Sequence, residues 1–256
     1  PYRRQRQMCI RDSDRNMRKI WVLNVGDIKP SEYQTEFFLD MAWDINLSGC
    51  KSGSGVVFSH LGNWLNQTFG KKTGKELLPL MKDFYLLSHI RKPEFMGNTR
   101  TYDKRHEQIA DLPWSTEEIN ERLERFKKLS DRVEKLYATV PSNRKEAYFE
   151  MIQYPVQASN EMNKKMLYAQ FARHTPSDSA SLWKKSDAAY DSIVSLTRRF
   201  NSLLDGKWNH IISTAPRGLI VFDKVKRTAS SMALVSSPAP LQLWNGTEHD
   251  LSLIHI

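Results

Sequence analysis

Four polar residues lie close together at the end of a short apolar run near the start of the chain. The run spans Ile20–Val25 and ends at Gly26. The polar residues are Asn24, Asp27, Lys29 and Glu32. A carboxylate such as that of Asp27 can act as a general acid, as a general base or as an acceptor for a sugar hydroxyl. Lys29 could pair with a carboxylate on a substrate or on the protein. These four residues are therefore the candidates for a catalytic or binding site.

The same residues also fit a structural interpretation. Carboxylates favour the N-terminus of a helix, so Asp27 and Glu32 could simply cap the helix that follows. Lys29 could form an ion pair with Glu32, which stands in the next turn of the chain. The spacing alone leaves the catalytic and the structural interpretations equally open.

The segments on either side of these residues have the pattern of a strand followed by a helix. The near-continuous apolarity of Ile20–Val25 is typical of a strand buried on both faces, as in a parallel sheet or barrel. Pro30 and the acids near it indicate a helix start, and Phe37 and Met41 fall on one side of that helix. In barrels built from such units, catalytic groups follow the C-terminal ends of the strands, which is where Asp27 stands.

The remainder of the chain has the periodicity of helices. Ser115 and Glu118 form a capping box that opens a long helix. Pro155 predicts a kink, and Gly206 supplies a helix stop. Helices are predicted over residues 60–69, 74–87, 115–137, 143–165 and 177–204.

These patterns predict an α/β part joined to an all-α part. Residues 14–58 are expected to be the C-terminal end of a (β/α)8-type barrel, and residues 59–227 an α-helical bundle. Residues 228–250 are rich in Ser, Ala and Pro and are expected to be a linker toward a further domain.

Both ends of the chain resemble translated sequencing adapter. Met8–Asp12 match one reading of the transposase adapter ATGTGTATAAGAGACAG, and Leu251–Ile256 match a reading of its reverse complement. Two complementary readings of one oligonucleotide at opposite ends are hard to obtain by chance. We therefore expect residues 1–13 and 251–256 to be adapter-encoded and the natural protein to be longer. The alternative is a basic arm that binds nucleic acid or anchors a domain.

Composition excludes several classes of protein. The formal net charge is +9, and it falls to +6 without the four Arg and one Asp of residues 1–13. The remaining charges are interspersed, as on a solvated surface, with no basic stripe that would bind nucleic acid. Cys50 alone remains outside residues 1–13, and the seven His have no metal-ligand spacing. No apolar run approaches the about 18 residues that cross a membrane. No cofactor, metal, nucleic acid or membrane is therefore expected as a partner.

Several segments together carry the pattern of a known family. They are Lys19–Glu32, Phe37–Trp43, Arg91–Glu94, Thr101–Tyr102, Ala147–Phe149, Tyr154–Ser159, Leu167–Gln170 and Gly206–His210. In this order they resemble glycoside hydrolase family 115, the xylan α-1,2-glucuronidases. The resemblance covers roughly residues 19–228. Leu47–Gly55 and Pro216–Leu219 depart from the family pattern.

The resemblance implies a secreted or periplasmic inverting hydrolase that removes 4-O-methylglucuronic acid or glucuronic acid from xylan. Inversion requires a carboxylic acid and a carboxylate about 6.5–9.5 Å apart. By this resemblance Asp27 is the catalytic candidate, and Asn24, Lys29 and Glu32 are the substrate-binding candidates. The other barrel carboxylates would precede residue 14, so the chain alone is expected to be inactive. Its expected partners are glucuronoxylan or its oligosaccharides, and a second copy of the chain bound through the helical part.

Two other functions remain open. The chain could be a non-enzymatic helical interaction module, or a different uronidase on the same scaffold. The predicted buried strand at Ile20–Val25 argues against the first, because a lone apolar strand needs a parallel sheet around it. Analogy of fold cannot decide the second.

Overall fold

The computed structural model describes residues 19–25, 28–44, 55–92, 95–97 and 111–227. These residues fall into two compact units. Unit 1 holds the described residues up to Asp83 together with those from Lys135 to Met151. Unit 2 holds Phe84–Glu134 and the described residues from Ile152 onward.

The described elements are helical. The α-helices are α2 (Glu32–Trp43), α3 (Gly55–Phe69), α4 (Lys71–Ile90), α5 (Thr116–Tyr137), α6 (Lys145–Tyr148), α7 (Tyr154–His174), α8 (Ser179–Asn201) and α9 (Leu203–Gly206). The other helical turns are η4 (Ser142–Arg144), η5 (Phe149–Gln153) and η6 (Pro216–Gly218). The prediction of a mostly helical chain is confirmed for the described residues.

The predicted strand is not observed. Residues 20–25 are irregular, and no described residue is assigned to a β-strand. Trp21 contacts the ring of Phe38 with centroids 6.1 Å apart, while Ile20 and Val22 are each 78% exposed. A strand exists only by pairing with a neighbour, and none of the described residues offers one to this segment. The barrel is therefore not shown by the described residues.

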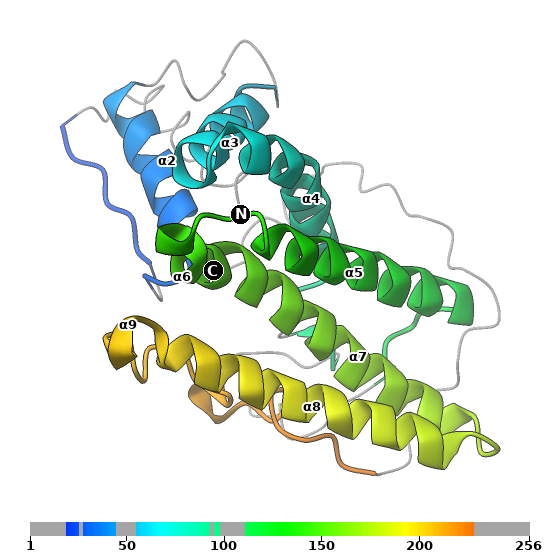
Figure 1. The fold of residues 1–256 in the computed structure, drawn as a ribbon. Coiled ribbons are helices and arrows are strands. Elements are labelled where there is room, and N and C mark those ends of the chain that lie inside the picture. The colour runs from blue at the N-terminus through cyan, green and yellow to red at the C-terminus, as the bar shows by residue number, and fades with distance from the viewer. Residues whose placement is uncertain (1–18, 26–27, 45–54, 93–94, 98–110, 228–256) are drawn as a thin grey trace. The chain divides into compact units, whose positions relative to one another are not determined.

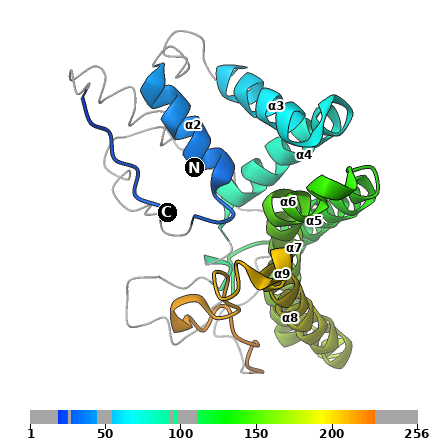
Figure 2. The same ribbon diagram turned by 60° about the vertical axis from the view of Figure 1, so that its left-hand side comes forward.

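Unit 1 is organised around the packing of α2 against α3, which lie side by side in Figure 2. The buried side of α2 carries Tyr33, Phe37, Phe38 and Met41. The ring of Tyr33 lies 5.1 Å from that of Trp64 on α3, and His60 Nε2 lies 2.9 Å from the Asp40 carboxylate. Apolar burial with a few polar bonds between the helices therefore fixes the start of α2, where the candidate residues lie.

Unit 2 is organised around α7, which packs along α8 (Figure 1). Buried residues on α7 include Met162, Met166, Leu167 and Ala169. They share one apolar core with Ile119 and Leu123 of α5, Trp183 of α8, and Leu219, Val221 and Val225 after η6. The burial of apolar side chains from these four segments holds the unit together.

Two local predictions concern helix ends and kinks. The capping box is confirmed: the Glu118 N–H donates to Ser115 Oγ at 3.2 Å, and the Ser115 N–H donates to the Glu118 carboxylate at 2.8 Å. The kink expected at Pro155 takes the form of a π-helical turn, η5, before α7. Proline cannot donate to the carbonyl four residues earlier and its ring crowds that carbonyl, so a wider turn upstream relieves the conflict. The helix then continues to His174, beyond the predicted end at 165.

Arg122 joins three segments of unit 2. Its guanidinium donates to Asn163 Oδ1 on α7 at 2.5 Å, to the Leu87 carbonyl on α4 at 3.2 Å and to the Arg91 carbonyl at 2.9 Å. The guanidinium carbon, Cζ, lies 4.9 Å from the ring centroid of Phe126. Burial, with the nearby positive charge of Arg91, lowers the pKa of Arg122 to about 10. The cation is therefore held by neutral acceptors and aromatic faces, which no shorter side chain can reach together.

Lys165 fastens the segment after η6 to α7. The side chain is fully buried, and Nζ donates to the Val221 carbonyl at 2.7 Å and to the Asp223 carbonyl at 2.8 Å. The ring of Tyr190 lies 5.8 Å away. Burial lowers the pKa of Lys165 to about 7, partly opposed by the Asp223 carboxylate. A neutral amine keeps two N–H donors, so both carbonyls remain bonded when the proton is lost.

Replacing Arg122 by alanine should destabilise the chain by about 3–5 kcal/mol. The change removes a buried cation and leaves the Leu87 and Arg91 carbonyls without their donors. Urea unfolding followed by circular dichroism measures the loss. The matched control is Arg125→Ala on the same helix, where a partly exposed pair with Glu121 at 3.8 Å should contribute less than about 1 kcal/mol. Equal losses in the two variants would contradict the role of Arg122.

The stability of the parent chain should depend on pH through Lys165. Its folded pKa of about 7 lies below the ordinary lysine value of 10.5, so the unfolded chain binds the extra proton between these values. Stability contributed by this group therefore rises with pH, by at most about 1.4 kcal/mol per pH unit. In urea titrations from pH 6 to 9, we expect the unfolding free energy of the parent to rise relative to that of Lys165→Met, because methionine does not titrate. Parallel pH profiles would show that the buried amine does not titrate in this range.

Candidate functional site

The structure describes three of the four residues predicted to form the site. Asn24 is exposed in the irregular segment, Lys29 precedes α2, and Glu32 is the first residue of that helix. Asp27, the predicted catalytic residue, lies outside the described residues, as does Gly26. Its role therefore stays a prediction.

Lys29 and Glu32 meet a third charged residue, Glu150 on the π-helical turn η5. Lys29 Nζ donates to Glu32 Oε1 at 2.7 Å and also to Glu150 Oε1. The exposed fractions of the side chains are 13% for Lys29, 27% for Glu32 and 9% for Glu150. The ion pair between Lys29 and Glu32, left open by the spacing, is thus present. We call these three residues the Lys29 cluster.

Burial and mutual charge shift the acid–base behaviour of the Lys29 cluster. Burial, reinforced by the neighbouring Glu32 carboxyl, raises the pKa of Glu150 to about 7, while Lys29 opposes the rise. Burial lowers the pKa of Lys29, but its hydrogen bonds to Glu150 and Glu32 outweigh this, so its pKa is raised. The Lys29 ammonium therefore stays charged, and one proton on the carboxyl pair is exchanged near neutral pH.

One carboxylate oxygen of Glu32 is buried without a donor: Glu32 Oε2 has no hydrogen-bond partner among the described residues. The interaction with the Glu32 carboxyl is one of the causes that raise the pKa of Glu150. A protonated carboxyl can donate a hydrogen bond to a carboxylate, whereas an ionised one cannot, so this interaction favours the acid form of Glu150.

Glu150 was not predicted from the sequence. It stands 121 residues from Lys29, and no local pattern joins the two. Its neighbours Tyr148 and Phe149 are fully buried. A single acid inside a run of apolar helix residues is the one signal that could have marked it, because a buried carboxyl requires a partner.

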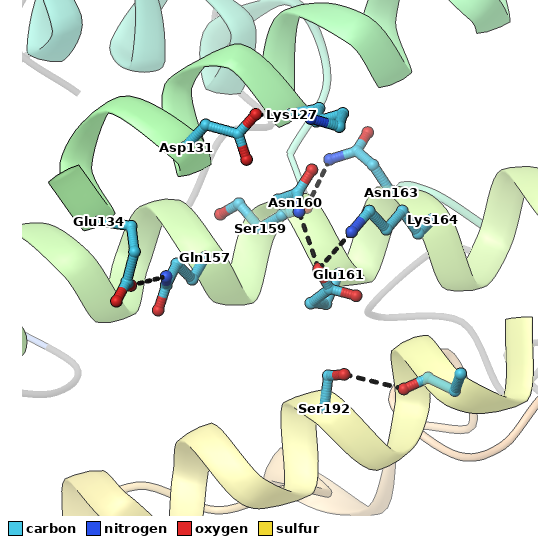
Figure 3. A network of polar contacts seen from close by, with 11 residues as sticks. Lys127, Asp131, Glu134, Gln157, Ser159, Asn160, Glu161, Asn163, Lys164 and Ser192 are labelled. Carbon is cyan, nitrogen blue, oxygen red and sulfur yellow. Dashed lines mark hydrogen bonds and ion pairs between the residues drawn. The ribbon is translucent and has the colours of Figure 1, made fainter. Parts of the chain in front are cut away.

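A second group of polar residues lines a shallow groove of about 460 Å³ on unit 2. Of the residues that line it, Figure 3 shows Gln157 and Glu161 on α7 and Ser192 on α8, among their polar contacts. Glu161 accepts from Asn160 at 2.8 Å and from Lys164 at 2.7 Å, and the Glu134 carboxylate accepts from Gln157 at 2.8 Å. These polar groups bond to one another along the helices, which is typical of a solvated surface.

The described parts of the chain lack a metal-binding cluster and a membrane-spanning helix. No group of three or more His, Cys, Asp or Glu residues there could hold a metal ion. None of the helices there is long and apolar enough to cross a membrane.

The matches among known proteins include the pattern of one family and a solved structure. The pattern of "Glycosyl hydrolase family 115" matches residues 3–95. A solved family 115 4-O-methyl-α-glucuronidase, with specificity for decorated arabinogalactans, shares 48% sequence identity over 91% of this chain, with a TM-score of 0.82. The chain spans about 30% of that enzyme's length. A search of the curated proteins found no match.

Both matches are to glycoside hydrolases. The chain belongs to glycoside hydrolase family 115. The family match begins at residue 3, so it does not separate residues 3–13 from the rest, and their origin in an adapter stays a prediction.

The acid form of Glu150 leads to a test by pH. Its folded pKa of about 7 lies above the ordinary glutamate value of 4.5, so the folded chain keeps a proton that the unfolded chain loses between these values. Stability contributed by Glu150 is present below about pH 4.5 and is lost as the pH rises to about 7. Glutamine resembles the protonated acid and does not titrate. We therefore expect Glu150→Gln to lose less stability than the parent between pH 4.5 and 7.

Urea unfolding at four pH values across this interval measures the effect. The control is Glu146→Gln, an exposed glutamate one turn earlier on α6. Its profile should follow that of the parent. A Glu150→Gln profile parallel to the parent's would contradict a raised pKa at Glu150.

Proposed function

We propose that the chain is part of an enzyme that hydrolyses the bond between 4-O-methylglucuronic acid or glucuronic acid and a plant polysaccharide. The observation that carries this proposal is the 48% identity with a 4-O-methyl-α-glucuronidase over 91% of the chain. Identity at this level, spread across both units, supports the same class of reaction.

Two polysaccharides are candidates for the substrate. The family resemblance of the sequence motifs favours glucuronoxylan or its oligosaccharides. The relative is specific for decorated arabinogalactans, which makes these polymers the second candidate. The residues that would distinguish the two belong to the proposed barrel, so the choice is one for experiment.

The proposed mechanism is inversion by a pair of carboxyl groups. One carboxylic acid protonates the leaving oxygen, and one carboxylate activates a water on the opposite face of the sugar. Asp27 is proposed as one of this pair, and Asn24, three residues earlier in the sequence, as a substrate contact. The second carboxyl is proposed to come from the remainder of the barrel.

Lys29 and Glu32 suit a supporting role in this site. Lys29 is bonded to two carboxyls, and only 13% of its side chain is exposed. Glu32 is held by the same contact at the start of α2. Export of the enzyme, and a dimer formed through its helical part, stay predictions.

Asparagine in place of Asp27 should lower glucuronate release by 100-fold or more, about the lower bound for losing an acid or base group. The chain spans about 30% of the related enzyme, so activity is best measured in a chimera. Residues 19–227 replace the matching segment of that enzyme, and glucuronoxylan and decorated arabinogalactan are tested in parallel. Nuclear magnetic resonance of the first-formed anomer distinguishes inversion from retention.

Two controls belong to this test. Asp191→Asn, an exposed aspartate on α8, should leave the rate unchanged. The 256-residue chain by itself should release no glucuronate. An active chimera that tolerates Asp27→Asn would reduce Asp27 to a helix cap. A chimera inactive on both polymers, beside an active unmodified relative, would favour the interaction module.

A further inference from the structure

Glu150 is the least exposed of the three residues of the Lys29 cluster. Its side chain is 9% exposed, and it contacts Lys29 across 121 residues of sequence. Lys29 is two residues after Asp27, and the Ser31 N–H donates to the Ile28 carbonyl at 3.0 Å in the turn that follows. The contact thus ties η5 to the loop that precedes α2.

We propose that Glu150 is a positioning residue for residues 28–31, which lead into α2: together with Glu32 it holds Lys29. Through these residues it supports the reaction proposed for Asp27, which lies two positions before Lys29 in the sequence. This inference rests on the proposed function, because it assigns Glu150 a part in the same reaction. No direct contact between Glu150 and the substrate is involved.

The two carboxyls that hold Lys29 are themselves anchored. Glu32 begins α2, whose Tyr33 and Phe37 are buried against α3. Glu150 follows Tyr148, whose ring lies 5.4 Å from Phe69 and 6.0 Å from Tyr137. A flexible lysine bonded to one partner can still swing, whereas bonds to two fixed partners define its position.

The exposure of the cluster argues for positioning rather than for catalysis by Glu150. A catalytic acid must reach the glycosidic oxygen or a water beside the sugar. The Glu150 carboxyl instead faces the Lys29 ammonium and the Glu32 carboxyl. Its hydrogen-bonding capacity is therefore used within the protein.

The test compares Glu150→Ala with Glu150→Gln in the chimera. Alanine removes the bond to Lys29 and should lower kcat roughly 10- to 100-fold, with KM changed much less, because a displaced catalytic group costs rate. Glutamine still accepts from Lys29 and should retain kcat within about threefold of the parent. Glu146→Ala, an exposed glutamate one turn earlier, is the matched control and should resemble the parent.

A double variant separates positioning from general destabilisation. Lys29→Met should lower kcat by a similar factor, and Lys29→Met with Glu150→Ala should lower it no further, because both residues act through one contact. Each rate is divided by the amount of folded enzyme, which circular dichroism measures. Losses that multiply, or an alanine variant with parental kcat, would overturn the inference.

Hydrogen exchange on the 256-residue chain gives a readout that does not depend on activity. Glu150→Ala should speed exchange in a peptide covering residues 19–31, while peptides from α8 stay at the parental rate. Unchanged exchange would overturn the inference even if the chimera is active. Faster exchange beside a parent chimera that releases no glucuronate would overturn the proposed function and leave the contact itself supported.

Discussion

A cation that is taken out of water must find acceptors inside the protein, and this requirement joins segments that are far apart in the chain. In unit 1 the Lys29 ammonium connects the loop before α2 with η5. In unit 2 Arg122 connects α4, α5 and α7, and Lys165 connects α7 with the segment after η6. Apolar contacts drive each unit to collapse, but they are not directional. The buried cations define which segments meet and in what register.

The acceptors decide whether such a cation keeps its charge. Lys29 lies between two carboxyls, and the opposite charge raises its pKa despite burial. Lys165 is bonded to two backbone carbonyls, so burial dominates and lowers its pKa to about 7. Arg122 is also held by neutral acceptors, and burial lowers its pKa to about 10. Because the ordinary pKa of arginine is much higher than that of lysine, the lowered value still leaves the guanidinium charged at neutral pH. The group that exchanges a proton near neutral pH is therefore the lysine itself in the case of Lys165. In the Lys29 cluster it is the Glu150 carboxyl, while Lys29 stays charged.

The features predicted from the sequence are those that depend on neighbouring residues. The capping box at Ser115 needs only the four residues that form it, and the long helices follow from their own periodicity. The strand predicted at Ile20–Val25 depends on partners that the described residues do not provide, and it is not observed. Glu150 could not be predicted as part of the site, because its contact with Lys29 crosses 121 residues. Asp27 lies outside the described residues, so the proposed catalytic group is tested by activity alone.

The charge of the Lys29 cluster bears on how the proposed substrate is bound. A uronic acid carries a carboxylate at neutral pH, so an enzyme that binds it needs a cation whose charge is not already offset. Lys29 is offset by Glu32, and above about pH 7 also by ionised Glu150. The cluster is therefore neutral or negative at the pH values where the substrate is negative, and it provides no net attraction for a uronate. In the proposed enzyme we therefore expect other cations of the proposed barrel to bind the uronate carboxylate, and Lys29 is proposed to act on the reaction through the residues that lead into α2.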